Sequence, residues 1–351
     1  MKILVTGGAG FIGSAVIRKA ISAGNKIINV DSLTYAANLE SLSSVSGHKN
    51  YNFEHQNICN SEAMTAIFAK HQPDCVLHLA AESHVDRSID GPKTFIDTNI
   101  LGTFTLLEAA RQYFDGLAAA KQADFRFHHV STDEVYGDLD ISDPAFSETT
   151  PYDPSSPYSA SKAASDHLVR AWGRTYGLPI IVTNCSNNYG PYQFPEKLIP
   201  VIILKALHRQ PIPIYGTGDN IRDWLHVDDH AKALLISLKS GEIGATYNIG
   251  GDNERTNLDI AKTICEIMDK HSDDGFHHAE LIEFVVDRPG HDRRYAVNAN
   301  KIEADLGWTP SMKFNEGFEQ TVIWYLENEA WWSPLIDANK FGHRLGLKAR
   351  S

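Results

Sequence analysis

Short apolar runs alternate with segments of helical periodicity along the first half of the chain. Residues 3–6 form an apolar run that ends in glycines, and residues 14–23 then carry apolar side chains at helical spacing up to Gly24. The alternation continues in predicted strands at 26–30, 75–80, 125–131 and 180–184, with predicted helices at 98–113 and 159–176. Apolar strands that alternate with helices predict an α/β fold, in which helices cover both faces of a parallel sheet.

The character of the sequence changes near residue 190. Prolines crowd the segment 191–213 and break the regular alternation, although a short apolar run at 247–249 has the composition of one more strand. We therefore predict a first domain over residues 1–190, to which a strand near 225–250 returns. A smaller mixed α/β domain over residues 191–351 is predicted to be partly interleaved with the first.

The segment 269–280 is polar and contains three histidines, His271, His277 and His278. Clustered histidines can bind a metal ion, but the polar composition is more typical of a solvated surface loop. No metal site is predicted there.

Composition and charge limit the classes of partner. The 351 residues are 42% hydrophobic and 22% charged, with a formal net charge of −12 that argues against binding nucleic acid or anionic membranes. An anionic ligand would need local arginines, lysines and backbone N–H groups. The four cysteines show no CxxC pair, and no apolar run has the length of a membrane span. These features predict a cytoplasmic protein with reduced thiols.

A glycine signature follows the first predicted strand and opens the first predicted helix. Gly7, Gly10 and Gly13 recur as GxxGxxG, which suits a tight turn and close approach of the backbone to a pyrophosphate at a helix N-terminus. Asp31 ends the second strand, where its carboxylate can accept hydrogen bonds from both adenosine ribose hydroxyls. The arrangement predicts a doubly wound sheet of the Rossmann type and favours NAD over NADP, because the carboxylate repels a 2′-phosphate.

Small residues at 79–83 end a later strand. They leave room for a cofactor along the sheet edge, but tight packing explains them equally well.

Tyr158 and Lys162 are four residues apart and share one face of a predicted helix. Lowering the pKa of a tyrosine from about 10 to about 7 requires roughly 4 kcal/mol. A lysine charge at about 4 Å supplies roughly that much at an effective dielectric constant of 20. Beside a nucleotide site, the pair is predicted to form a base that removes a hydroxyl proton as hydride leaves the same carbon.

Thr132, Asp133 and Glu134 close the strand predicted at 125–131, at the edge where open α/β sheets place their ligands. Thr132 is placed to hydrogen-bond the same substrate hydroxyl. Side chains of neighbouring residues in an extended chain point to opposite sides, so both acids reach one substrate only if the backbone turns here. Adjacent carboxylates repel, so that one keeps its proton while the other ionises, which makes an acid–base pair for elimination. A solvated acidic turn is the alternative.

Longer motifs strengthen this interpretation. They are Ala80 to Ser88, Thr98-Asn99, Ser131 to Gly137, Tyr158 to Lys162, Asn187 to Pro191, Pro195 to Pro200, Asn220 to Trp224 and Asp287 to Asp292. With them the chain resembles the extended short-chain dehydrogenase/reductases, and specifically the nucleotide-sugar 4,6-dehydratases, from residue 3 to about residue 310. The Thr-Asp-Glu triplet is the specific part, because the related sugar-nucleotide epimerases lack the paired acids.

The resemblance implies a hydro-lyase with tightly bound NAD that acts on dTDP-glucose, a first step toward deoxysugars. Tyr158 would deprotonate the C4 hydroxyl as hydride leaves C4, Glu134 would remove the C5 proton, and Asp133 would protonate the departing C6 hydroxyl. Hydride would then return to C6, giving dTDP-4-keto-6-deoxyglucose.

The motifs and the resemblance together assign the contacts. Cofactor contacts are expected from Gly7, Gly10, Phe11, Ile12, Gly13, Asp31, Ser32, Leu33, Thr34, Asn57, Ile58, Leu79, Ala80, Ala81, Ser83, Thr98, Tyr158, Lys162 and Asn188. Substrate contacts are expected from Ser83, His84, Asp86, Thr132, Asn187, Glu196, Lys197, Leu198, Pro213, Tyr215, Arg222, Asn257, Arg288, His291 and Tyr295. Asn57 departs from the aspartate common in the family, although an amide can also hydrogen-bond.

Two other interpretations stay open at this point. One is another NAD-bound sugar-nucleotide enzyme, either a 4-epimerase or a dehydratase of a different nucleotide sugar. The other is a non-catalytic NAD-binding protein, against which the intact Tyr158, Lys162 and paired acids argue. The resemblance further implies a homodimer joined through helices of the first domain, such as 98–113 and 159–176.

Overall fold

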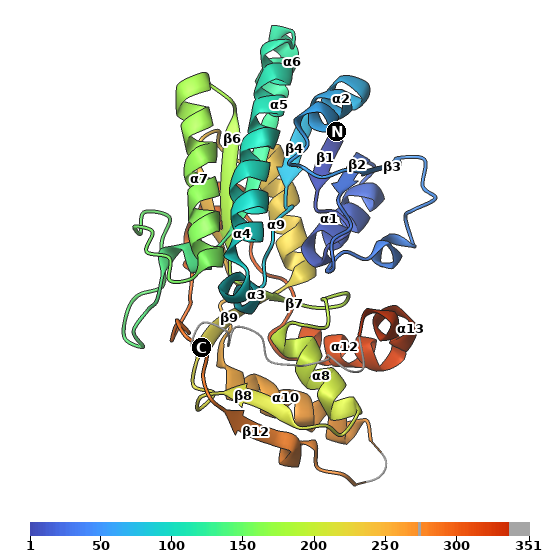
Figure 1. Cartoon of the computed structure of the whole chain (residues 1–351), viewed down its shortest axis with the longest axis vertical. Helices are drawn as coiled ribbons and strands as arrows, with labels where there is room; N and C mark the ends of the chain where they lie inside the picture. Colours follow the sequence, from blue (N-terminus) through green and yellow to red (C-terminus); the bar gives the residue numbers. More distant parts are fainter. Residues whose placement is uncertain (273–274, 337–351) are drawn as a thin grey trace.

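The computed structural model describes residues 1–272 and 275–336. Figure 1 shows a larger lobe, in which long helices lie against a sheet, and a smaller lobe beyond one end of that sheet. The N-terminus lies in the larger lobe, at the end of the sheet away from the smaller lobe. No described helix is both long enough and apolar enough to cross a membrane.

The larger lobe is built on seven parallel strands in the order β10-β6-β5-β4-β1-β2-β3. The strands are β1 (Lys2–Thr6), β2 (Lys26–Asp31), β3 (Tyr51–His55), β4 (Cys75–His78), β5 (Arg126–Thr132), β6 (Ile180–Cys185) and β10 (Thr246–Ile249). Strand order reverses between β1 and β4, which creates a crevice at the carboxyl ends of the strands where such folds bind ligands. The predicted α/β fold of the Rossmann type is confirmed.

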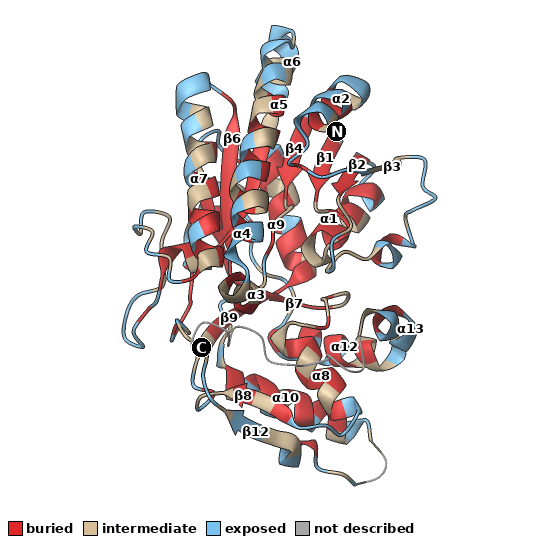
Figure 2. Cartoon of the chain, viewed as in Figure 1, coloured by how far each residue is buried: buried red, intermediate tan, exposed pale blue. Residues whose placement is uncertain are grey.

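Helices cover both faces of this sheet (Figures 1 and 2). The covering helices are α1 (Phe11–Ser22), α2 (Ser61–His71), α5 (Thr103–Asp115), α7 (Pro157–Tyr176), α9 (Val227–Ser240) and α11 (Asn300–Leu306). The short helices α3 (Val85–Asp90), α4 (Pro92–Phe95) and α6 (Ala119–Asp124) complete the lobe. Alternate residues of β1 serve the two faces: Ile3 and Val5 pack in the cluster of α1 and α9, whereas Leu4 packs in the cluster of α2, α5 and α7.

The helix predicted at 98–113 has a different start in the structure. A π-helical segment, η2 (Ile96–Gly102), precedes α5. By contrast, α7 begins close to the predicted position. Ser156 and Ser159 form a capping box there, and a proline occupies the first turn. Strand β3 and helix α2 were not predicted. Strand β3 is half-exposed and lacks the continuous apolar run used to recognise strands.

The smaller lobe and its junction contain shorter elements. Its helices are α8 (Leu198–Leu207), α10 (Asn257–Lys270), α12 (Phe314–Glu327) and α13 (Glu329–Trp332), around strands β8 (Ile212–Tyr215) and β12 (Ile282–Val285). A second small sheet joins β7 (Asn187–Tyr189), β9 (Ile221–His226) and β11 (Glu254–Thr256). Short 3₁₀ turns are η1 (Leu39–Leu42), η3 (Asp133–Tyr136), η4 (His278–Leu281) and η5 (Ser333–Leu335).

The chain crosses between the lobes more than once. After β9, helix α9 packs on α1 and strand β10 pairs with β6 of the larger sheet, so the run at 247–249 does return to it. The proposed division at residue 190 stays a prediction.

The segment 269–280 was expected to be a solvated loop, and this is wrong for its ends. Helix α10 continues to Lys270, and the buried ring of His278 lies 2.6 Å from Asp269 Oδ1 through Nδ1. Apolar contacts of α10 and a hydrogen bond of Asp269 thus hold residues 269–270 and 278, although the composition around them is polar. Within the described residues, no group of His, Cys, Asp and Glu side chains is arranged to hold a metal ion.

Acid should destabilise the larger lobe. Burial lowers the pKa of His128 to about 3, of His129 to about 4 and of His230 to about 3. The unfolded chain, with histidine pKa values near 6.5, binds these protons first, so stability is full above about pH 6.5 and falls as pH drops towards 4. Three such groups contribute a slope of about 4 kcal/mol per pH unit in that window. Urea midpoints measured at steps from pH 7.5 to 5 should therefore fall steeply, and a flat series would contradict the prediction.

Candidate active site

Two adjoining cavities lie between the lobes at the carboxyl ends of the parallel strands. One, of about 360 Å³, runs along the sheet edge from Gly7 to Asn188. The other, of about 910 Å³, opens between the larger lobe and α8, β8 and β9. Glu134 and Asn187 line both cavities, so ligands bound in the two cavities would meet beside these residues.

The turn between β1 and α1 brings backbone close to the first cavity. Gly7 has φ +71°, and a Cβ there would lie 2.7 Å from the Ala80 nitrogen, so a side chain does not fit. Helix α1 has Gly10 at its N-cap, with no side-chain cap and no acidic residue in its first turn. Its N–H groups and positive dipole end therefore suit an anionic group.

Asp31 lies at the end of β2 on the same cavity, and its pKa is raised by burial. Its carboxylate accepts hydrogen bonds from the Ala9 N–H at 2.9 Å and from the Leu33 N–H at 2.8 Å. Leu33, which was expected to touch the cofactor, is not on the cavity wall, because its backbone at φ 52° is turned towards Asp31. The other predicted cofactor residues line this cavity.

Asn57 and Ile58 form part of the wall beyond Asp31. The Asn57 side chain accepts a hydrogen bond from the Cys59 N–H at 2.8 Å, which caps the turn before α2. Its amide group keeps donors that an aspartate lacks.

The backbone turns at the Thr132-Asp133-Glu134 triplet, as simultaneous access of both acids requires. Strand β5 ends at Thr132, and the 3₁₀ turn η3 begins at Asp133, so Asp133 and Glu134 line the same cavity. Thr132 Oγ1 accepts a hydrogen bond from the Glu134 N–H at 3.3 Å. Gly137 ends the turn at φ +96°, where a Cβ would lie 2.5 Å from the Asp153 carbonyl oxygen.

The two carboxyl groups differ in their surroundings. Burial, and then the charge of Glu134, hold the pKa of Asp133 well above its ordinary value. Burial also raises the pKa of Glu134, but the positive charges of Arg288, Arg222 and Lys197 oppose that rise. Asp133 therefore keeps a proton more readily than Glu134 does.

Tyr158 and Lys162 line the cavity from α7, one helical turn apart. The expectation that Lys162 lowers the pKa of Tyr158 is wrong for this structure. Burial raises that pKa well above 10, and the negative charge of Glu134 adds to the rise, whereas a hydrogen bond with Thr132 opposes it. Lys162 Nζ donates instead to the Val130 carbonyl at 2.9 Å, and burial lowers its own pKa.

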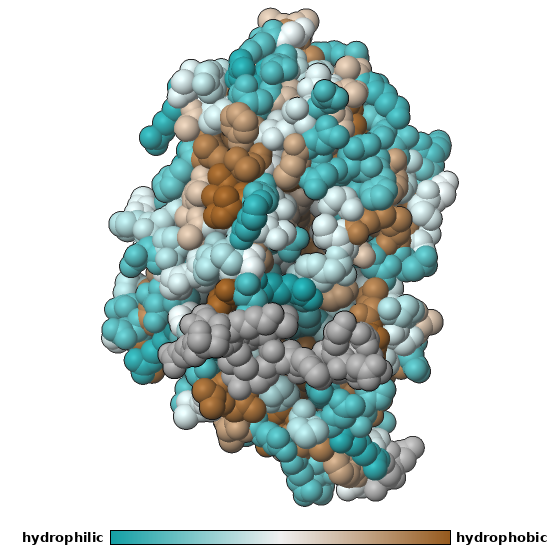
Figure 3. All heavy atoms as spheres, in the orientation of Figure 1, coloured by the Kyte–Doolittle hydropathy of each residue, from teal (hydrophilic) through white to brown (hydrophobic). Residues whose placement is uncertain are grey.

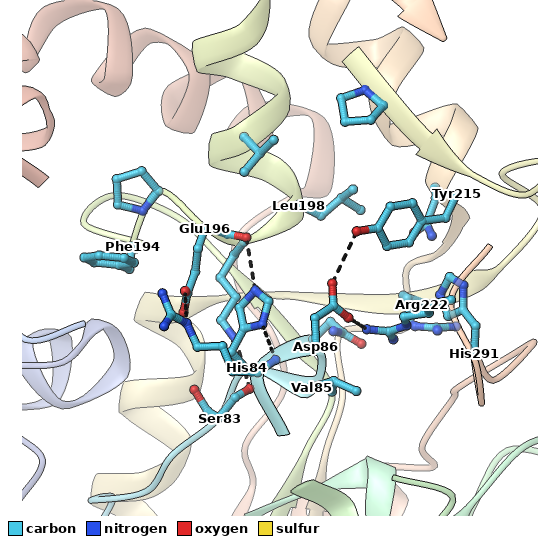
Figure 4. A pocket seen from close by; sticks show the side chains of 18 of the residues that line it. Ser83, His84, Val85, Asp86, Phe194, Glu196, Leu198, Tyr215, Arg222 and His291 are labelled. Carbon is cyan, nitrogen blue, oxygen red and sulfur yellow. Dashed lines mark hydrogen bonds and ion pairs between the residues drawn. The ribbon is translucent and has the colours of Figure 1, made fainter. Parts of the chain in front are cut away.

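The second cavity gathers the remaining predicted substrate residues, and only Thr132 of that set lies on the first cavity alone. Figure 4 shows Asp86 joined to Tyr215, whose hydroxyl donates to Asp86 Oδ2 at 3.3 Å. Arg288 donates to Asp86 Oδ1 at 2.6 Å, and Arg222 lies 4.3 Å from the centre of the Tyr295 ring. Two guanidinium groups are thus held by buried partners beside the open space.

A second cluster joins the two lobes at the mouth of the cavities. Glu196 accepts hydrogen bonds from Tyr35 Oη and from Arg87 Nε, each at 2.9 Å, and Arg87 lies 3.9 Å above the Tyr35 ring. The neighbouring Lys197 donates to the Ser83 carbonyl at 2.9 Å. Glu196, assigned to substrate, is therefore already paired within the protein.

Several wall residues were missed by the sequence analysis. They include Tyr35, Val85, Arg87, Val130, Ser131, Cys185, Ser186, Phe194, Pro195, Trp224, Leu335 and Ile336. Val85, Arg87, Ser131, Pro195 and Trp224 lie inside the motifs quoted above but were not assigned as contacts. Phe194 adjoins one motif and Cys185 lies two residues before another, so those motifs could have been extended. Leu335 and Ile336 lie far along the chain from every motif, and only folding brings them to the site.

Comparison with known proteins agrees with this geometry. The family model of GDP-mannose 4,6 dehydratase matches residues 4–321. The chain belongs to this family of dehydratases, and the resemblance predicted from its motifs is confirmed.

Individual relatives indicate which dehydratases of this family the chain resembles in sequence and structure. The dTDP-glucose 4,6-dehydratase of Escherichia coli is 59% identical, with 99% of each chain covered. DesIV, the dTDP-glucose 4,6-dehydratase of Streptomyces venezuelae solved with NAD and TYD bound, has a TM-score of 0.88 at 42% identity and covers 96% of this chain and 100% of its own. The Bacillus anthracis dTDP-glucose 4,6-dehydratase, solved in complex with NAD, has a TM-score of 0.85 at 44% identity with the same coverage.

Proposed function

We propose that the chain is an NAD-dependent dTDP-glucose 4,6-dehydratase, a hydro-lyase that forms dTDP-4-keto-6-deoxyglucose. The observation that carries the proposal is the turn at η3, which puts two carboxyl groups of different proton affinity into one cavity with Tyr158. A dehydrogenase or epimerase has no need of an added acid and base, whereas elimination of water needs both. The relatives named above carry this activity in their descriptions.

The first cavity fits NAD. Gly7 lies so close to Ala80 that no side chain fits between the backbone and the cavity. The N-terminus of α1 has no side-chain cap, so its N–H groups can bind a pyrophosphate. Asp31 faces the same cavity with a carboxylate that suits ribose hydroxyls and disfavours a 2′-phosphate. When bound, NAD accepts hydride from the sugar and returns it within the same turnover.

The second cavity fits a nucleoside diphosphate. Three residues that line it have a buried polar atom without a hydrogen-bond partner among the described residues. These atoms are Asn187 Oδ1, Asn257 Oδ1 and Arg288 Nε. Unpaired buried polar atoms are costly unless a ligand completes them. Arg222 and Arg288 supply the planar donors that phosphate groups favour, despite the acidic balance of the whole chain.

The residues divide the proton transfers among them. Tyr158 Oη takes the proton of the C4 hydroxyl, with Thr132 Oγ1 as a second hydrogen-bond partner. Because the pKa of Tyr158 is raised in this structure, ionisation of its phenol requires positive charge beyond that of Lys162, which lies one turn along α7 but donates to the Val130 carbonyl.

Elimination falls to the paired acids. A ketone at C4 acidifies the C5 proton, which Glu134 accepts with its charge balanced by Arg288, Arg222 and Lys197. Asp133, which holds its proton more firmly, donates it to the C6 hydroxyl as water departs.

The decisive experiment supplies dTDP-glucose and UDP-glucose separately to the purified protein and identifies the products. We expect a 4-keto-6-deoxy sugar from dTDP-glucose, and NAD rather than NADP released when the protein is denatured. A galactose product would show a 4-epimerase instead, product from UDP-glucose alone would show a dehydratase of another nucleotide sugar, and no product with either would contradict the proposal.

We also infer that the enzyme is a homodimer, whose interface includes η2, α5 and α7. Figure 3 shows hydrophobic residues gathered over α5 and α7. Leu101 is 51% exposed, Phe104 43% and Tyr176 48%, which is unusual for large apolar side chains that lie near one another. A cytoplasmic location fits the four cysteines, all unpaired and all within the described residues.

The substitution Phe104→Glu should convert the dimer into monomers, because it places a charge in an apolar contact. Ile243→Glu, at a residue 52% exposed in the turn before β10, is the matched control and should leave the mass unchanged. Light scattering checks both. A wild-type chain that is already monomeric, or a Phe104→Glu protein that stays dimeric, would contradict this interface.

A further inference from the structure

A buried polar network lies directly behind the turn that carries the two acids. Asn184, on β6, is fully buried, and its Nδ2 donates to the Thr132 carbonyl oxygen at 3.0 Å. Thr132 is the last residue of β5, so this bond holds the backbone at the point where η3 begins. Asn184 is absent from the walls of both large cavities, so its shortest link to the site is the bond to Thr132.

Asp166 orients Asn184 from α7. Its Oδ2 accepts a hydrogen bond from the Tyr152 hydroxyl at 2.9 Å, and Asn184 Nδ2 lies 3.3 Å from that hydroxyl and 3.4 Å from Oδ2 itself. Its Oδ1 lies 3.1 Å from His129 Nε2. Asp166 also follows Lys162 by one helical turn, so one carboxylate stands behind both the lysine and the acid turn.

A fully buried carboxylate is expensive, and the protein keeps this one ionised. Burial alone would raise the pKa of Asp166, but that pKa is lowered, because the contact with His129 and the positive charges of Lys162 and Arg170 outweigh burial. A simple tie between α7 and the sheet does not require a charge, since apolar side chains of similar volume serve as well or better. A negative charge here has two uses. It orients the Asn184 amide so that Nδ2 points to the Thr132 carbonyl, and it balances the charge of Lys162 one helical turn away.

We propose that Asn184 and Asp166 are positioning residues that set the direction of Asp133 and Glu134 for elimination. The inference rests on the proposed dehydratase function, which it deepens. A displacement of about 1 Å in a catalytic group can lower a rate by about 100-fold. Loss of this support should therefore affect elimination, which uses both acids, more than C4 oxidation, in which Tyr158 takes the proton and Thr132 is only a second hydrogen-bond partner.

The test compares Asn184→Leu and Asp166→Asn with Thr183→Val as a matched control. Thr183 is the neighbouring residue of β6, is equally buried, and bonds His128 Nε2 at 3.0 Å on the opposite face of the sheet. The control therefore loses one buried hydrogen bond of the same strand without touching Thr132.

Single-turnover measurements with dTDP-glucose separate the steps, since reduced cofactor reports oxidation and the 6-deoxy product reports elimination. In Asn184→Leu, elimination should slow at least about tenfold relative to oxidation. Asp166→Asn should slow elimination too, and oxidation with it, because Asp166 also neighbours Lys162. Thr183→Val should keep the wild-type ratio. Equal slowing of both steps in Asn184→Leu, or a ratio like that of the control, would overturn the proposal.

Amide hydrogen exchange over residues 131–137 gives a readout that does not need activity. Exchange in this segment should be faster in Asn184→Leu than in Thr183→Val, because the turn loses a tether. Unchanged exchange would overturn the positioning role even if the enzyme is a dehydratase. If the wild-type protein makes no product, the proposed function fails, while the exchange result still decides whether Asn184 holds the turn.

Discussion

The substitution Glu134→Gln should leave C4 oxidation intact and reduce formation of the 6-deoxy product by about 100- to 10,000-fold, the range of general base catalysis. Glutamine keeps the size and hydrogen-bonding shape of the side chain but does not accept the C5 proton. Glu134 is the acid whose charge is balanced by Arg288, Arg222 and Lys197, and it is therefore the one suited to be the base. Oxidation, which depends on Tyr158, should proceed and stop with reduced cofactor on the enzyme.

Rapid mixing with dTDP-glucose measures cofactor reduction, and incorporation of solvent deuterium at C5 measures proton removal. Glu242→Gln, on an exposed turn before β10, serves as a control and should behave as the wild type. Asp133→Asn should also slow loss of water, but deuterium exchange at C5 should survive because Glu134 is intact. Full dehydration by Glu134→Gln would show that another group is the base.

The second large effect is expected at Tyr158. Tyr158→Phe removes the α7 hydroxyl that lines the cofactor cavity together with Thr132 and Glu134. This hydroxyl is the group proposed to accept the proton of the C4 hydroxyl. Cofactor reduction should fall at least about 100-fold, so that no later step is observed. Affinity for dTDP should be unchanged, because Tyr158 does not line the cavity of Arg222 and Arg288.

Stopped-flow absorbance of the reduced cofactor and calorimetry with dTDP check these two expectations. Tyr113→Phe is a suitable control, since the Tyr113 hydroxyl donates to the Pro73 carbonyl at the opposite end of the sheet. Reduction at the wild-type rate in Tyr158→Phe would remove Tyr158 from the mechanism. Weakened dTDP binding together with slow reduction would point to a collapsed site rather than a lost base.

Much of the site was accessible from the sequence because its parts are local. The glycines of 7–13 and Asp31 follow consecutive strands of a parallel sheet, and the ends of such strands meet at one edge. The same rule placed the Thr132 triplet correctly at the end of β5. Strand β3 lay beyond this reasoning, since a half-exposed edge strand lacks a continuous apolar run.

Electrostatics required the structure. The pKa of Tyr158 was expected to fall because of the charge of Lys162, yet burial and Glu134 raise it, and Lys162 donates to the Val130 carbonyl. Desolvation depends on everything packed around a group, and spacing along a helix carries no information about it. The unequal pKa values of Asp133 and Glu134 have the same origin, in arginines and a lysine from distant segments.

The sequence by itself determined the fold class, the family and the residue types of the reaction, because periodicity and strand-end motifs are properties of short segments. Tertiary structure decided which acid keeps its proton, how Glu196 is paired with Tyr35 and Arg87, and that Asn184 supports the acid turn from behind. These depend on contacts between residues far apart in the chain, whose distances and burial exist only once the lobes have packed together.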